Sequence, residues 1–202
     1  MMQMIRKIEK QLSNRQVRII GQDQMKNAAV ILPLIDIDGE LSVLFEVRSY
    51  ELRSQPGDIC FPGGRIDEQD KSPRDAALRE LTEELQIQSK YIQLLADLDI
   101  LITPFKGIIY PYVAQVIYPF TEIKANPAEV DHLFTVPLRH FYLHPPEQHP
   151  MRFIIEPETN SRYKHVQHQR HTIEQYFYYY ETYTIWGLTA RILKHFIDIT
   201  KP

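Results

Sequence analysis

Three glutamates, Glu80, Glu83 and Glu84, occupy a short stretch of the sequence. In a helix that turns about 100° per residue, Glu80 and Glu84 are about 40° apart on one face, and Glu83 is about 60° from Glu80 on the other side. Like charges at this spacing repel each other unless a cation lies between them. Carboxylate oxygens are hard ligands that suit Mg²⁺ or Mn²⁺. An acidic, solvated helix face is the alternative that the three residues alone leave open.

A helix that carries these glutamates is predicted from about Pro73 to Gln86. Ser72 is a favourable N-cap, and proline is tolerated in the first helical turn. Apolar residues cover much of the remaining circumference and would anchor the helix in a core: Ala76, Ala77, Leu78, Leu81, Leu85 and Ile87. The glutamates would then stand on a rigid support.

The glutamates belong to a longer pattern. It runs from Gly64 through Asp70 to residues 79–87, which read RELTEELQI. This pattern resembles the Nudix box, the signature of hydrolases that cleave diphosphates linked to another group. Two features depart from the family pattern: residues 71–78 form a spacer one residue longer than usual, and Gln86 stands where the family has glycine.

The resemblance implies a catalytic role for Glu80, Glu83, Glu84 and Arg79. The glutamates are expected to bind Mg²⁺ or Mn²⁺, with Glu80 and Glu84 as the first ligands and Glu83 as the third. Arg79 is expected to pair with a neighbouring carboxylate and to hold its rotamer. The implied fold is the α/β Nudix fold, in which a mixed β-sheet is sandwiched between α-helices.

A second pattern directly precedes the box. Residues 44–49 read LFEVRS, and Arg53, Gly57 and residues 61–64, FPGG, follow with three residues between successive parts. These spacings resemble the motif of the coenzyme A diphosphatase branch of the Nudix family, although the family pattern opens with Leu-Leu-Thr. The resemblance implies hydrolysis of the diphosphate of coenzyme A or its derivatives to 4′-phosphopantetheine and adenosine 3′,5′-bisphosphate.

Substrate contacts are expected from Arg48, Arg53, Gly63 and Gly64. A guanidinium matches phosphate with a planar fork, and glycine lets the backbone approach a phosphate or metal without a Cβ. A structural ion pair is the alternative for Arg48. Other functions remain open, namely a Nudix hydrolase of dinucleotide polyphosphates or nucleotide sugars, or a nucleotide-sensing domain without catalysis.

Composition limits the possible partners of the chain. Its 202 residues, of which 44% are hydrophobic, suit a single domain, with an N-terminal helical extension over residues 1–26 and a core over about residues 28–193. A net charge of −3 argues against a nucleic-acid binder that uses a basic field. The lone Cys60 is expected to be a buried, unreactive thiol in a reducing cytosol. No apolar run is long enough to span a membrane, so a cytoplasmic protein without membrane partners is expected.

Further elements follow from periodicity and turn residues. Strands are expected at residues 28–37 and 41–47, joined at Asp38-Gly39, with Pro33 marking an edge strand or a bulge. The remaining expected elements are strands at 91–103, 108–118 and 174–183 and a helix at 185–199. A tyrosine of the 174–183 strand could stack on adenine, with core packing as the alternative.

Three segments allow more than one interpretation. Residues 1–12 are expected to form an amphipathic helix that packs on the domain or on a partner subunit, such as a second copy, with a membrane-surface segment as the alternative. Residues 126–130, NPAEV, are expected to lead into a short helix, where Glu129 is a general base, a metal ligand or merely an acid favoured by the helix dipole. The histidines between residues 140 and 171 are expected in solvated loops rather than in a metal site: His140, His144, His149, His165, His168 and His171.

Overall fold

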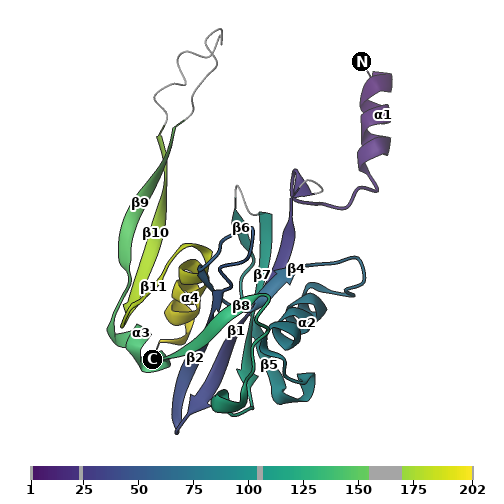
Figure 1. Ribbon diagram of the computed structural model, residues 1–202. Helices are drawn as coiled ribbons and strands as arrows, with labels where there is room; N and C mark the ends of the chain where they lie inside the picture. The colour runs from purple at the N-terminus through teal and green to yellow at the C-terminus, as the bar shows by residue number, and fades with distance from the viewer. Residues whose placement is uncertain (1, 23–24, 104–106, 155–169, 202) are drawn as a thin grey trace.

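The structure is a computed structural model that describes residues 2–22, 25–103, 107–154 and 170–201 (Figure 1). Its elements are α1 (Met2–Leu12), β1 (Asn27–Ile37), β2 (Glu40–Arg48), β3 (Ile59–Cys60), β4 (Gly63–Arg65), α2 (Pro73–Leu85), η2 (Ser89–Tyr91), β5 (Ile92–Asp97), β6 (Leu101–Thr103), β7 (Gly107–Val116), η3 (Phe120–Glu122), β8 (Val130–Pro137), α3 (Leu138–Leu143), β9 (Glu147–Ile154), β10 (Arg170–Tyr180), β11 (Tyr183–Ile185) and α4 (Gly187–Thr200). The main sheet has the order β3-β2-β1-β7-β5, and β4, β6 and β8 pair with β1, β7 and β2. A second sheet has the order β11-β10-β9.

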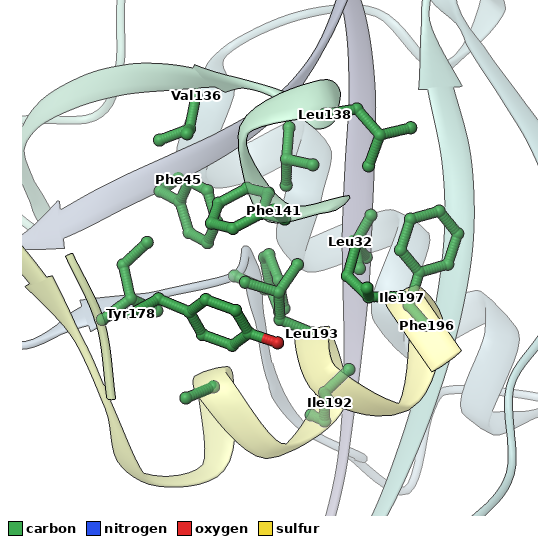
Figure 2. Close-up of a cluster of buried hydrophobic side chains, with 14 of the residues drawn as sticks. Leu32, Phe45, Val136, Leu138, Phe141, Tyr178, Ile192, Leu193, Phe196 and Ile197 are labelled. Carbon is green, nitrogen blue, oxygen red and sulfur yellow. The ribbon is translucent and has the colours of Figure 1, made fainter. Parts of the chain in front are cut away.

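Helices cover both faces of the main sheet, so the predicted mixed sheet between helices is confirmed. On one face, α2 buries Leu81 and Leu85 in a cluster with Ile31 of β1. On the other face, α3 and α4 pack against the sheet in a second cluster (Figure 2), whose labelled members are Leu32, Phe45, Val136, Leu138, Phe141, Tyr178, Ile192, Leu193, Phe196 and Ile197. Successive side chains of β1 point to opposite faces of the sheet, so they contribute to two separate hydrophobic clusters.

The predicted hairpin of β1 and β2 is confirmed. Asp38 and Gly39 both have positive φ, 52° and 85°, as a two-residue type I′ turn requires. Gly39 N–H donates to Asp36 Oδ1 at 3.0 Å, which closes the turn. The turn sets the register of β1 against β2, and that register decides which strand residues face α2.

The prediction that Pro33 marks an edge strand or a bulge is wrong, because β1 is a central strand. It pairs with β7 over residues 27–35 on one side. On the other side, β4 pairs with β1 as far as Val30, and β2 pairs with it from Leu34 onward. Ile31 N–H donates to Pro62 O on this second side. The backbone nitrogen of Pro33 faces the same side, because it is two residues further along the strand. The donor that proline lacks therefore faces the point where β1 changes partner.

Helix α2 matches its predicted bounds. Ser72 Oγ accepts from Asp75 N–H at 3.2 Å, so Ser72 is the N-cap, and Pro73 begins the helix. At the other end, the exposed Gln86 is in the left-handed region, with φ 51° and ψ 39°. A glycine adopts this conformation without a Cβ clash, whereas glutamine does so at a cost. Gln86 therefore performs the turn that glycine performs in the family pattern.

Replacing Gln86 with Gly is expected to raise the free energy of unfolding by about 0.5–1 kcal/mol, because relief of the left-handed strain exceeds the extra entropy of an unfolded glycine. Urea melts would measure the gain. Gln88→Gly is the matched control: Gln88 has φ −75° and ψ 144°, so glycine there relieves no strain and is expected to destabilise. Equal effects of the two variants would contradict this interpretation.

Two predicted boundaries shift. The 91–103 strand is two strands, β5 and β6, both paired with β7. The strand predicted at 174–183 is β10, which begins earlier and ends at Tyr180, and a turn at residues 181–182 connects it to β11. The helix predicted from residue 185 begins at Gly187, because Ile185 is the last residue of β11.

Residues 126–130 were expected to lead into a short helix, but strand β8 follows them directly. Asn126 caps a single turn, and its backbone carbonyl accepts from Glu129 N–H and Val130 N–H. Strand β8 begins at Val130 because the next residues pair with β2. The first short helix after this point is α3, at Leu138–Leu143.

The N-terminal amphipathic helix forms as predicted, but it does not pack on the domain. Every residue of α1 is exposed. Figure 1 shows α1 beyond the end of β1, apart from both sheets. Across the described ranges, no helix is both long and apolar enough to cross a membrane.

Candidate functional site

Glu80 and Glu84 project from the face of α2 that lies beside β4. The helix is anchored by buried Ala76, Ala77 and Leu81, which pack against β1 and β7. Glu84 is only 2% exposed, and its Oε2 accepts from Gly63 N–H at 2.8 Å. The helical periodicity of the box therefore places Glu84 in contact with Gly63, the first glycine of the pair.

Glu129 joins these two glutamates from a distant part of the chain. One carboxylate oxygen from each of Glu80, Glu84 and Glu129 lies within 4.8 Å of the others. The turn that carries Glu129 is bonded to α2 itself, because Asn126 N–H donates to the Glu84 carbonyl at 2.8 Å. Ser49 N–H donates to the Glu129 carbonyl at 2.8 Å, which holds the turn from the other side.

The helix-dipole interpretation of Glu129 is wrong, since no helix begins at this described turn. Glu129 is instead a member of the carboxylate group, one of the roles that its sequence left open. Asn126 Oδ1 accepts from Ala128 N–H at 3.2 Å, so the asparagine shapes the turn that presents Glu129.

Glu83 lies outside this group. Its side chain is 56% exposed, and its Oε2 accepts from Arg79 Nη1 at 3.3 Å. The helical angles place Glu83 on the far side of Glu80 from Glu84. The carboxylate group therefore consists of Glu80, Glu84 and Glu129.

Arg79 connects the loop before α2 to the helix. Its Nε and Nη2 donate to the two oxygens of Asp70 at 3.1 and 3.0 Å, and its Nη1 donates to Glu80 Oε1 at 2.9 Å. Nη2 also donates to the Arg65 carbonyl at 3.2 Å. The guanidinium holds the pKa of Asp70 below its ordinary value. Arg79 thus fixes the rotamer of Glu80 and closes the box loop with a two-pronged ion pair.

Gly63 and Gly64 each allow a close contact that a Cβ would block, but with different parts of the structure. A Cβ on Gly63 would lie 2.6 Å from Val30 Cα, so this glycine lets β4 lie against β1. A Cβ on Gly64 would lie 2.7 Å from Glu80 Oε2. Gly64 therefore leaves the room that the Glu80 carboxylate occupies.

Glu46, which stands where the pattern of the coenzyme A diphosphatase branch has threonine, is a buried acid in β2. It is 1% exposed, Cys60 Sγ donates to its Oε1 at 3.0 Å, and its Oε2 has no hydrogen-bond partner within the described chain. Burial raises the pKa of Glu46 to about 7. The sequence feature that could have identified Glu46 is its position as an acid within the apolar run of β2. Cys60 is half-buried rather than buried as expected, and burial and the Glu46 carboxylate raise the pKa of its thiol.

The residues of the carboxylate group fit a divalent cation. Burial raises the pKa of Glu84 to about 9, with further increases from the charges of Glu46, Glu80 and Glu129. Burial also raises the pKa of Glu80 above its ordinary value, although Arg79 opposes this shift. A cation at the centre would remove both penalties, because it stabilises the ionised carboxylates. Three hard oxygen donors are the ligands that Mg²⁺ and Mn²⁺ prefer.

The upstream motif closes a loop over residues 49–56. Arg48 N–H donates to the Asp58 carbonyl at 2.9 Å, and Gly57 N–H donates to the Arg48 carbonyl at 3.0 Å. The spacing between Arg48 and Gly57 in the motif is therefore the length of the hairpin loop that connects β2 to β3. Arg53 lies exposed in this loop.

A pocket of about 320 Å³ adjoins the glycine pair between the main sheet and the start of α4. Its lining is mostly apolar, from Val30, Phe61, Ile109 and Leu188, and it also includes Arg48 and Gly63. Arg48 Nε is buried and has no hydrogen-bond partner in the part of the chain that the structure describes. Gly63 therefore separates an apolar pocket with one arginine from the carboxylate group.

The histidines form no such group among the described residues. His140 and His149 lie in α3 and β9 rather than in loops, which corrects that prediction. His140 is half-buried and His144 is exposed, and their rings stack with centroids 4.3 Å apart. His165 and His168 lie outside the described residues, and only the backbone of His171, in β10, is described.

Comparison with known proteins agrees with this architecture. A family model of the NUDIX domain matches residues 25–176. The chain is 34% identical to the uncharacterized Nudix hydrolase NudL of Photorhabdus laumondii over 182 residues, 85% of this chain and 83% of that protein. It is also 34% identical to the peroxisomal coenzyme A diphosphatase NUDT7 of Mus musculus over 117 residues, 58% of this chain and 49% of that protein.

One solved structure covers most of the fold. A MutT/nudix family protein from Enterococcus faecalis has a TM-score of 0.50 and 14% identity, over 96% of this chain and 68% of that one. At this identity the likeness concerns the fold alone. The match of the family model and the relative of similar length decide the assignment. This chain belongs to the Nudix hydrolase family.

Proposed function

We propose that this protein hydrolyses the diphosphate of coenzyme A or its derivatives, with Mg²⁺ or Mn²⁺ held by Glu80, Glu84 and Glu129. The products would be 4′-phosphopantetheine and adenosine 3′,5′-bisphosphate. The observation that carries the proposal is that the upstream motif and the box meet at Gly63. This residue lines the pocket that contains Arg48, and its N–H bonds the Glu84 carboxylate.

The resemblance of the relatives supports the same substrate. The mouse relative is named a coenzyme A diphosphatase, and its similarity covers about half of each chain. The spacings of the motif are those of the hairpin loop between β2 and β3. The proposed substrate therefore depends on this loop and on the pocket beside it.

The roles of the residues follow from their positions. The carboxylates of Glu80, Glu84 and Glu129 would bind the cation, and the bound cation would neutralise the diphosphate and lower the pKa of a water molecule. Arg79 holds the Glu80 carboxylate in place through its bond at 2.9 Å. Glu83 holds Arg79 from the exposed side. These contacts keep the ligand set in one geometry before substrate arrives.

The cationic residues of the motif are proposed to bind the substrate. Arg48 Nε is buried and unpartnered among the described residues, so an acceptor group of the substrate would satisfy it. Arg53 lies exposed at the loop and would reach phosphate from the solvent side. The apolar lining around Arg48 would exclude water from the part of the substrate that enters the pocket.

A panel of diphosphates tests this proposal. With saturating Mg²⁺ or Mn²⁺, kcat/KM for coenzyme A is expected to exceed that for dinucleotide polyphosphates, nucleotide sugars and ADP-ribose by tenfold or more, which is about 1.4 kcal/mol of transition-state binding. Arg53→Lys serves as a matched variant that keeps the charge and removes the fork, and it is expected to raise KM for coenzyme A. A tenfold preference for any other member of the panel would overturn the substrate assignment.

A further inference from the structure

The N-terminal helix α1 presents a complete apolar face to solvent. Met4, Ile5, Ile8 and Leu12 are 71%, 56%, 49% and 57% exposed, and no residue of α1 is buried. Figure 1 shows the helix apart from both sheets. The family model begins at residue 25, so α1 lies outside the part of the chain that makes the Nudix fold.

The apolar and basic residues of α1 occupy opposite sides of the helix. At about 100° per residue, the four apolar residues fall within an arc of about 100°. The basic residues Arg6, Lys7 and Lys10 fall within a second arc of about 100° on the other side. Such a helix has an apolar stripe for burial and a cationic face for a charged surface.

Charge divides sharply between this segment and the rest of the chain. Residues 1–26 contain six basic and two acidic residues, a net charge of +4. Residues 27–202 therefore carry a net charge of −7, since the whole chain has −3. The cationic segment continues after the helix with Arg15 and Arg18. A partner for this segment must offer both apolar contact and negative charge.

We propose that α1 lies in the plane of an anionic lipid surface and attaches the hydrolase to it reversibly. Acyl chains would cover the stripe of Met4, Ile5, Ile8 and Leu12, and the headgroups would neutralise the basic face. The negative body would be repelled by the same headgroups, so contact is confined to the N-terminal segment. One short helix gives weak binding that reverses readily.

Pairing of α1 with α1 of a second copy fits the same residues less well. Two helices of 11 residues would juxtapose their net positive charges. A stable protein interface buries about 1,200–2,000 Å², and four apolar residues from each helix provide far less. A lipid surface has no such size limit and has the opposite charge.

Vesicle sedimentation with the full chain tests the proposal. Binding is expected to vesicles of phosphatidylcholine with about 30% phosphatidylserine, and to be at least tenfold weaker to phosphatidylcholine alone. Ile5→Glu with Ile8→Glu is expected to abolish binding, because it places two charges in the apolar stripe. Replacing Arg6, Lys7 and Lys10 together with Gln is expected to weaken binding about 100-fold, at about fivefold for each basic residue near the surface.

Gln3→Ser is the matched control, because it changes a neutral residue on the polar face and should leave vesicle binding unchanged. Diphosphate hydrolysis in the absence of vesicles should be the same for all variants, since α1 contributes nothing to the carboxylate group. Equal binding to both kinds of vesicle, or no binding to either, would overturn the proposal. So would a dimer in light scattering that disappears in the Ile5→Glu, Ile8→Glu variant, which would assign the stripe to a second copy.

Discussion

Glu84→Gln is expected to lower kcat by about 100-fold or more with Mg²⁺, because it removes a charged ligand while it keeps the shape of the side chain. Without metal, the variant should be as stable as the wild type or more stable. The buried carboxyl, whose pKa is raised to about 9, is costly to the metal-free fold, and an amide is not ionised. The amide oxygen of the new side chain could still accept from Gly63 N–H, as Glu84 Oε2 does at 2.8 Å.

Thermal melts with and without Mg²⁺, set beside turnover rates, check this expectation. Saturating Mg²⁺ should raise the wild-type Tm more than the variant's, because only binding to the folded state adds stability. Glu83→Gln is the matched comparison, since Glu83 is on the same helix but is 56% exposed and bonded to Arg79. It should lower kcat less than Glu84→Gln does. A large loss of metal-free stability in Glu84→Gln would instead indicate a structural role.

The metal-free protein is expected to become less stable as pH rises from about 4.5 to about 9. In the unfolded chain the carboxyls of Glu46 and Glu84 titrate near 4.5, whereas in the folded chain burial raises their pKa to about 7 and about 9. Between these values the folded state binds more protons than the unfolded state, so each rise in pH favours unfolding. The loss of stability levels off above the higher of the two pKa values.

Urea melts of the chelator-treated protein across this pH range measure the effect. Glu46→Gln should reduce the slope of the profile between about pH 4.5 and 7, and Glu84→Gln should reduce it between about pH 4.5 and 9. Mg²⁺ should reverse the slope, because the cation binds the ionised carboxylates and its affinity rises with pH. A metal-free stability that increases with pH over this window would contradict the raised pKa values.

What the sequence predicted well is what local rules determine. Ser72 and Pro73 mark the start of α2 through capping, which depends on a few neighbouring residues. The common side of Glu80 and Glu84 follows from the helical period alone. The type I′ turn at Asp38-Gly39 likewise follows from two residues that tolerate positive φ.

What the sequence could not supply depends on distant contacts. Glu129 reaches the carboxylate group because Asn126 N–H bonds the end of α2, a contact that no local pattern encodes. Glu46 became a buried acid only because α2 covers its face of β2. Pro33 suggested an edge strand by a local rule, but the change of partner from β4 to β2 supplied a place for it inside the sheet. In each case contacts between distant parts of the chain, rather than residue type, decided the outcome.

The most direct test of the central claim is mass spectrometry of the products that the purified protein forms from coenzyme A and Mg²⁺ in ¹⁸O-labelled water. The account predicts 4′-phosphopantetheine and adenosine 3′,5′-bisphosphate in equal amounts, one of them carrying the label, with no product after addition of chelator or with Glu84→Gln at equal enzyme and short times. Intact coenzyme A alongside complete hydrolysis of another diphosphate from the panel, or products released without a divalent cation, would contradict it.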